Sequence, residues 1–589
     1  MADKILNSFD VWIGAQGWKS KLRLRNVDNI TLEGVSRLRE VILELAVRGK
    51  LLNQDQNDEP ASVLLKKIAS EKNVLISGKF SKPKTLPEIG DEEKPFEVPS
   101  NWVWCRMQDV STYIQRGKGP IYSEAGSVQV ISQKCIQWTG FDISKAKFVD
   151  DSSIDKYQGE RFLVDGDLLW NSTGTGTVGR INVLSRKSEY RLVADSHVTV
   201  IRPLNVNSRF LWCYLASPGI QSKITELGKS DSIVSGSTNQ VELNTTSVVR
   251  LSVPLPPLAE QHRIVAKVDE LMALCDDLER QETNHLKSHQ LLVETLLGTL
   301  TQAKDAAEFQ TAWATLAQHF DDLFITDDSI DQLKQTILQL AVMGKLIPQD
   351  PNDEPASVLL GRIRKENEKH DKIKKRKDTH PISTNETPFE VPKGWVWCRL
   401  SETCDLITDG THQTPKYTTG GRMFLSAQNV KPFSFSPDVF QYVSEEDYQG
   451  YVKSRRPELY DILLTRVGAG IGQAAMIDRE LEFAFYVSLA LLKPIKSLLF
   501  PKYLELYLNS PLGRGHSFDK TLGRGVSAGN LNLSLIRNFE VPLAPRKEQE
   551  RIVSKATELF ALCDALKERI TESQKIVNLM ADSILEQVV

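Results

Sequence analysis

The segment with the clearest potential for chemistry is GTGTVG, from Gly174 to Gly179, which matches the G-x-G-x-x-G pattern of dinucleotide and S-adenosylmethionine loops. In such loops the turn opens a helix whose N-terminus faces the phosphates or the cofactor. Here a strand-like segment, RINVLSRKSEYRLV, follows instead, and the corresponding VGAGIGQ from Val467 to Gln473 has another glycine spacing. The sequence favours a tight glycine turn, with a methyltransferase loop as the alternative.

Other residue sets that could carry catalysis are missing from the sequence. It contains neither the G-x-x-x-x-G-K-[ST] loop of ATP sites nor the [DN]-P-P-[FY] tetrapeptide of amino-methylating DNA enzymes. His197 and His412 have no recognisable nucleophile or metal-ligand partner, and the seven cysteines form no C-x-x-C pair. We therefore predict no catalytic residues and no metal site on this chain.

The segments that must position any functional residue occur twice in the sequence. ILELAVRGKLLNQDQNDEPASVLL returns 295 residues later as ILQLAVMGKLIPQDPNDEPASVLL, and PFEVPSNWVWCR returns as PFEVPKGWVWCR. VPLPPLAEQHRIV returns as VPLAPRKEQERIV, each followed by a segment that contains a cysteine, Cys275 or Cys563. A tandem repeat of this length predicts two similar modules. The segments between these borders scarcely match, so one frame carries two different inserts.

The repeated frame is predicted to be helical because its apolar residues recur at 4-3-4-3 spacing, the pattern of a coiled-coil seam. Two such helices of about 40 residues, each about 60 Å long, could bury their stripes against each other as an antiparallel pair. The alternative is two amphipathic helices packed on separate domains. The predicted seam comprises Ile264, Val268, Leu271, Cys275 and Leu278 in the first copy and Ile552, Leu559, Cys563, Leu566, Ile570, Val577 and Ile584 in the second.

The inserts contain short β-branched and aromatic runs broken by Gly, Asn, Asp and Pro, which is typical of strands with long loops. We expect an α+β protein in which two globular domains of mixed helix and strand are joined by long helices that form an antiparallel coiled coil, with a pseudo-two-fold internal repeat. The predicted boundaries are a helical region with a linker at 1–100, inserts at 101–252 and 395–540, a central frame at 253–394, and a final helix at 541–589.

Charge gives a weak indication of the partner. The net charge is −3 overall, but +3 over 102–252 and +1 over 395–540, so the inserts are mildly basic and the frame is acidic. The run from Lys374 to Lys377 could contact DNA phosphates or be a solvated linker. The sequence has no apolar run long enough to span a membrane and no signal peptide at its start, which predicts a cytoplasmic protein.

The border motifs resemble the conserved regions of specificity subunits of type I restriction–modification enzymes. GDLLWNSTGTG, YDILLTRVGAGIG and TDGTHQTP resemble motifs of that family's target recognition domains, whereas IQRGKGP, from Ile114 to Pro120, departs from the third motif. The additional copy of the LAV-x-GKL and DEPAS region is similar to the longer enteric subclass called type IB.

This resemblance implies a non-catalytic DNA-specificity subunit that reads a two-part, asymmetric site with one target recognition domain per half. It implies modification subunits that methylate adenine with S-adenosylmethionine and ATP-driven restriction subunits, so that S-adenosylmethionine, ATP and Mg²⁺ are bound on partner chains and none on this one. The alternatives are a self-contained S-adenosylmethionine-dependent DNA methyltransferase and a structural coiled-coil adaptor.

Base-reading residues can be proposed only by type, since Arg and Lys suit guanine edges and Asn and Gln suit adenine. Replacing Arg466 by alanine is expected to weaken specific binding by about 1–3 kcal/mol if Arg466 reads a base. The candidates are Arg116, Lys118, Gln133, Lys134, Asn171 and Arg180 in the first insert and His412, Gln413, Arg422, Asn429, Arg466, Arg514 and Arg524 in the second.

Overall fold

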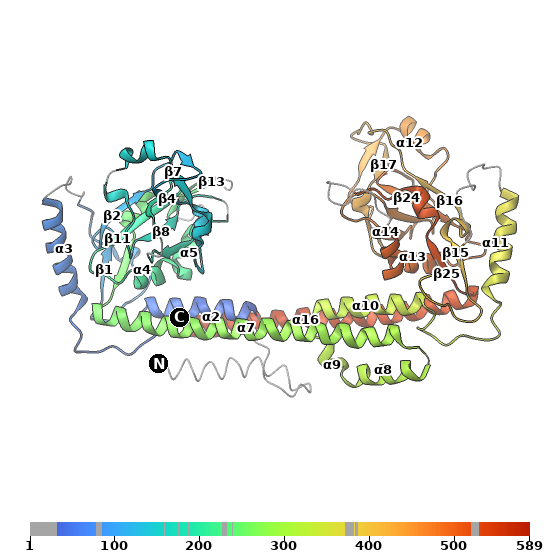
Figure 1. Cartoon of the computed structure of the whole chain (residues 1–589), viewed down its shortest axis with the longest axis horizontal. Helices are drawn as coiled ribbons and strands as arrows, with labels where there is room; N and C mark the ends of the chain where they lie inside the picture. The colour runs from blue at the N-terminus through green and yellow to red at the C-terminus, as the bar shows by residue number, and fades with distance from the viewer. Residues whose placement is uncertain are drawn as a thin grey trace. The chain divides into compact units, whose positions relative to one another are not determined.

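The computed structural model divides into two compact units, one formed by residues 1–286 with 575–589 and the other by 287–574. In each unit a domain built around two larger sheets is packed on helices of the frame (Figure 1). Among the described residues, no helix is both long enough and apolar enough to cross a membrane. The structure describes residues 32–588 except 78–84, 158, 175, 186–188, 226–231, 238–239, 305, 371–381, 383–386 and 520–528.

The first insert is built on a four-stranded antiparallel sheet in the order β2-β11-β8-β9, beside a second sheet in the order β10-β4-β7-β3. The strands are β1 (Val103–Arg106), β2 (Ser111–Arg116), β3 (Tyr122–Ser123), β4 (Val128–Ile131), β5 (Ile136–Gln137), β6 (Gly140–Phe141), β7 (Lys147–Val149), β8 (Leu168–Asn171), β9 (Ile181–Val183), β10 (Arg191–Ala194), β11 (Val198–Pro203), β12 (Val234–Ser237), β13 (Gln240–Leu243) and β14 (Ser252–Leu255).

The second insert repeats this plan with a sheet in the order β16-β24-β21-β22 and a smaller sheet in the order β20-β17-β23. The predicted pair of α+β inserts is confirmed. The strands are β15 (Val396–Arg399), β16 (Cys404–Asp409), β17 (Arg422–Leu425), β18 (Val430–Lys431), β19 (Ser434–Phe435), β20 (Gln441–Val443), β21 (Ile462–Thr465), β22 (Ala474–Met476), β23 (Phe483–Phe485), β24 (Leu489–Pro494) and β25 (Glu540–Leu543).

Helices form the frame and one face of each insert. The first-unit helices are α2 (Leu32–Val47), α3 (Ala61–Ser77), α4 (Ser208–Leu215), α5 (Pro218–Thr225), α6 (Thr245–Arg250) and the first part of α7 (Leu258–Gln302). The second unit contains the end of α7, followed by α8 (Ala306–Gln318), α9 (Phe320–Leu323), α10 (Asp327–Val342), α11 (Ala356–His370), α12 (Glu445–Val452), α13 (Pro501–Asn509), α14 (Pro511–Asp519), α15 (Leu533–Arg537) and most of α16 (Arg546–Val588).

The central strand β8 is apolar on both faces because it separates two cores. Leu168 and Trp170 belong to the core that contains α4 and α2, whereas Leu169 belongs to the core shared with the second sheet. Alternate side chains of a strand point to opposite faces, so one strand supplies both cores. In β21, Ile462 and Leu463 divide in the same way.

The border motifs close each insert at its base. β1 pairs antiparallel with β14, with Val103 opposite Leu255, and β15 pairs in the same way with β25. The first and last strands of an insert therefore lie side by side, and the chain enters and leaves each insert at one place.

The repeated E-Q-x-R-I-V motif holds the start of each long helix against its unit. Gln261 is fully buried, donates to the carbonyl of Pro256 at 2.9 Å and accepts from the backbone N–H of Asn207 at 2.9 Å. Arg263 pairs with Asp58 of the N-D-E-P motif at 2.5 Å, as Arg551 pairs with Asp353. These contacts explain why both motifs occur twice.

The long helices are confirmed, and the structure shows what each stripe is buried against. In the first unit Ile264, Val268 and Cys275 enter the same core as α2, with Leu271 and Leu278 half-buried against it. In the second unit the last turns of α7 and the first half of α16 run antiparallel and share a core with α10 (Figure 1). That core contains Ile552 and Cys563, with Leu559, Leu566 and Ile570 half-buried against it. The side chains of Val577 and Ile584 are outside the described set.

Candidate nucleic-acid interface

The glycine-rich segments form turns within β-hairpins. β8 and β9 pair antiparallel on either side of the first segment, where Gly174 and Gly179 have φ of 99° and 89°. β21 and β22 flank the second segment, where Gly468 and Gly472 have φ of 99° and 79°. Left-handed backbone favours glycine. The strand-like continuation expected from the sequence is confirmed, since the next elements after the two turns are the strands β9 and β22.

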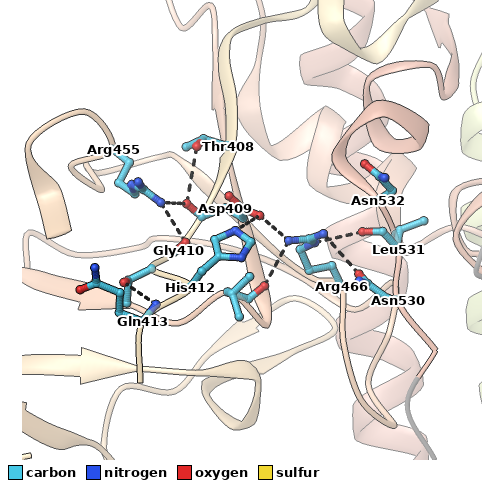
Figure 2. Close-up of polar contacts among 12 residues, drawn as sticks. Thr408, Asp409, Gly410, His412, Gln413, Arg455, Arg466, Asn530, Leu531 and Asn532 are labelled. Carbon is cyan, nitrogen blue, oxygen red and sulfur yellow. Dashed lines mark hydrogen bonds and ion pairs between the residues drawn. The ribbon is translucent and has the colours of Figure 1, made fainter. Parts of the chain in front are cut away.

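A cluster of polar side chains lies where β16 and β21 of the second insert end (Figure 2). The carboxylate of Asp409 accepts hydrogen bonds from Arg466 and from Nε2 of His412, the latter at 3.0 Å. Arg466 also donates through Nε to the carbonyl of Leu531 at 3.0 Å and through Nη2 to Asn530 at 3.2 Å. Arg466 thus ties the end of β16 to the segment that precedes α15.

The chain leaves this cluster as an exposed loop. Residues 412–421 are exposed apart from Pro415. Arg455 supports the start of the loop because its Nη1 donates to the carbonyls of Asp409 and Gly410 at 2.7 and 2.8 Å. Of the predicted residues, His412 and Gln413 are on this loop with exposed side chains, and the structure brings Arg466 and His412 together through Asp409. A loop of this kind can reach a groove of DNA from a rigid base.

At the same place in the first insert the predicted Arg116 ends β2. Its Nη1 pairs with Glu242 at 2.6 Å and its Nη2 donates to the carbonyl of Leu243 at 2.9 Å. Lys118, two residues further, donates to the carbonyl of Lys156 at 2.9 Å. Both cations are half-buried and hold the insert's own segments together.

The remaining candidates of the first insert surround the glycine turn. Gln133 accepts from the hydroxyl of Thr177 at 3.3 Å, and Arg180 donates to Gln137 at 3.0 Å. Lys134 is exposed. Asn171 is completely buried, and its amide donates to the carbonyl of Gln133 at 3.1 Å, so in this structure it cannot reach a base edge.

The remaining candidates of the second insert are spread over its surface and core. Arg422 pairs with Glu445 and Glu482. Asn429 is buried and its amide donates to two backbone carbonyls, so it closes a loop and cannot meet a base edge as placed here. Arg514 lies over the ring of Phe518, and burial lowers the pKa of its guanidinium. Arg524 is outside the described residues.

Sequence reasoning missed the acidic partners at both strand ends. Asp409 and Arg466 are 57 residues apart in the chain, and Glu242 is 126 residues after Arg116. The only local signal was that Asp409 stands in the quoted TDGTHQTP segment. Among the described residues, no group of three or more His, Cys, Asp or Glu side chains could hold a metal ion.

Comparison with known proteins gives the family. The family model described as "Type I restriction modification DNA specificity domain" matches residues 99–288 and 392–574, more than half of the chain. The type I restriction enzyme EcoAI and EcoEI specificity subunits of Escherichia coli are 35% and 34% identical, each over 99% of this chain and 98% of the relative. A chain from a structural study of complex assembly and conformational transition of the type I R-M system is 19% identical, covering 84% of this chain and 99% of that one, with a TM-score of 0.48.

The family match covers both inserts together with the first part of each long helix, and the two Escherichia coli relatives extend the similarity to nearly the whole chain. These matches favour a DNA-specificity function over a self-contained methyltransferase or a structural adaptor. The chain belongs to the DNA-specificity subunits of type I restriction–modification enzymes.

Proposed function

We propose that this subunit reads a DNA site of two different halves, one with each insert, while separate chains carry out the chemistry. One observation carries the proposal: two sheets of the same strand order are closed by the same border strands and carry different strand-end residues and loops. A repeated support with divergent loops suits two readers of different sequences.

The proposed partners are modification subunits that methylate adenine and restriction subunits that use ATP. S-adenosylmethionine, ATP and Mg²⁺ would be bound by those subunits, all in the cytoplasm. The repeated frame helices would be their docking surface, since each unit offers the same helix arrangement.

A chimera made only from this chain tests the proposal. Replacing residues 400–539 by a second copy of 107–251 keeps both border strands, because Met107 N–H bonds the carbonyl of Leu251 at 2.8 Å just as Leu400 bonds Phe539 at 2.9 Å. The wild type and the chimera would each be expressed with the modification and restriction subunits, and methylated adenines mapped across the genome.

We expect the wild type to methylate a site with two different halves and the chimera a site with two copies of one half. An unchanged site would contradict the assignment of one half to each insert. Binding of S-adenosylmethionine by the isolated subunit would favour the self-contained methyltransferase instead. The reciprocal chimera, with 400–539 in place of 107–251, is the matched control and should duplicate the other half.

A further inference from the structure

The two inserts place a guanidinium at the same point but carry it on different strands. Leu243 and Leu531 are equivalent, because their N–H groups bond the carbonyls of Ser172 and Arg466, the residues that follow β8 and β21, at 2.7 and 2.9 Å. The carbonyl of Leu243 accepts from Arg116 at the end of β2. The carbonyl of Leu531 accepts from Arg466 itself.

The acidic partner of this guanidinium also lies on different strands in the two inserts. In the first insert Glu242 comes from β13, and its side chain is 54% exposed. In the second insert the acid is Asp409 on β16, at the position that Arg116 has on β2, and its side chain is only 13% exposed. Ser172, in the place of Arg466, instead forms a 2.5 Å hydrogen bond with Thr199.

This difference between the strand-end residues affects the loop that follows β16 in the second insert. Asp409 is three residues before His412, whose side chain is 69% exposed while its Nε2 bonds the buried carboxylate. A carboxylate accepts, so Nε2 carries a proton, and in the neutral form of a ring bonded in this way Nδ1 is an acceptor. No described residue bonds Nδ1 of His412. The first insert has Lys118 and Gly119 here, with no such ring.

We propose that His412 is a specificity-determining residue that accepts a hydrogen bond from an exocyclic amino group, N6 of adenine or N4 of cytosine, in the major groove, and that the Asp409–Arg466 pair is the positioning device that orients its ring. This inference rests on the proposed function. The buried pair suits the role because Arg466 is fixed by Leu531, Asn530 and Asp409 together, which leaves the carboxylate little freedom to turn.

The test compares binding to a set of DNA duplexes. The methylated site of the wild type is first mapped, and duplexes are made with that site and with each base pair changed in turn. His412→Ala, in the full chain with its modification subunits, should lose about tenfold discrimination at one base pair of a single half, with affinity for unrelated DNA unchanged.

A graft separates positioning from folding. Asp409→Arg, Arg466→Ser and Asn530→Glu together reproduce the arrangement of the first insert while keeping His412. The graft should unfold at a temperature close to that of the wild type and still lose discrimination at the same base pair as His412→Ala. If the folded graft keeps full discrimination, the pair does not position His412 and that part of the proposal is wrong.

His197→Ala is the matched control, since His197 is an exposed residue of the first insert whose ring bonds Thr173 at 2.7 Å, while its backbone N–H, not its ring, bonds the buried carboxylate of Asp195. It should leave the base pair that depends on His412 unchanged. If the wild type prefers no sequence, the proposed function fails. If the wild type prefers a site and His412→Ala discriminates at every base pair of that site as well as the wild type does, only this inference is overturned.

Discussion

Trp212 of the first insert and Glu505 of the second occupy the same buried place and use it in opposite ways. Each is two residues before a tyrosine, Tyr214 or Tyr507, whose hydroxyl bonds the first residue of the closing strand. The indole of Trp212 donates to a carbonyl of β9 at 3.0 Å, whereas the carboxylate of Glu505 accepts from an N–H of β22 at 2.8 Å. The same fold tolerates a neutral donor and an ionisable acceptor at one position.

Other contacts, in contrast, are the same in both units of the repeat. The tyrosine bonds, the border strands and the pairs between Asp58 and Arg263 and between Asp353 and Arg551 are the same in both units. The polar groups inside the inserts differ in residue type and even in the strand that carries them. The frame keeps its particular residues in both units, whereas the inserts use different side chains to bond their strands.

The largest expected difference between the inserts is in the unfolding free energy that is lost when the strand-end arginine is replaced. Arg466→Met should destabilise the second insert by about 3–5 kcal/mol, because the buried carboxylate of Asp409 loses its charged partner and keeps only the hydrogen bond from His412. Arg116→Met should cost about 1 kcal/mol or less, since Glu242 is exposed to water. Urea denaturation, with hydrogen exchange in β21 and β8 to assign the transition, measures both. Equal losses would mean that the two pairs are energetically alike.

The second difference is in pH dependence. Burial raises the pKa of Glu505 from its ordinary 4.5 to about 7. The folded state then binds the proton more tightly than the unfolded state, so the stabilisation is complete below about pH 4.5 and is lost as the pH rises through about 7. The wild type should therefore lose on the order of 2–4 kcal/mol of unfolding free energy between pH 4.5 and 8, and Glu505→Gln should not show this loss.

Urea denaturation at pH 4.5 and at pH 8 gives this difference. Trp212→Phe is the matched control in the first insert and should lower stability equally at both pH values. If the difference in unfolding free energy between the wild type and Glu505→Gln were the same at pH 8 as at pH 4.5, the raised pKa of Glu505 would be contradicted.

A third test concerns a feature that the inserts share. Gly117 and Gly410 follow the strand ends, and a Cβ at either would overlap the backbone carbonyl oxygen of Ala194 or Phe485. Alanine at either position should therefore cost about 1–3 kcal/mol. Thermal unfolding of the two variants checks this. A clear difference between them would show that the strand ends are less alike than their backbone hydrogen bonds indicate.

The smallest difference between the units is expected in the frame. Arg263→Ala and Arg551→Ala each leave a buried carboxylate, Asp58 or Asp353, without its charged partner, so each should cost about 3 kcal/mol. Denaturation of the two single variants and the double variant gives the values. The losses should be equal and additive, because the two pairs belong to different units.

The sequence was sufficient to predict the repeat, the long helices and the strand-rich inserts because these depend on local patterns. Helices α2 and α10 end shortly before Gly49 and Gly344, whose left-handed φ of 68° and 70° suits glycine at both copies of the repeat. The sequence did not show that Cys275 and Cys563 would each be buried within their own unit, since an apolar stripe does not specify its partner.

The candidate site was less predictable for the same physical reason. Residue type identified Arg466 and His412, but not that one would be buried and the other exposed. Asn171 and Asn429 suit adenine by type, yet both stabilise backbone inside the fold. Charge pairs such as Arg116 with Glu242 depend on tertiary proximity, which the spacing along the chain does not encode.

The pairing of β1 with β14 and of β15 with β25 has a consequence for the history of such proteins. Adjacent antiparallel strands are about 5 Å apart, so inserts of different length and sequence can join the same two ends without disturbing the rest. The nearly identical segments that flank each insert are also stretches in which two genes could recombine. A single crossover on each side would replace one insert and leave the border strands and the frame helices unchanged.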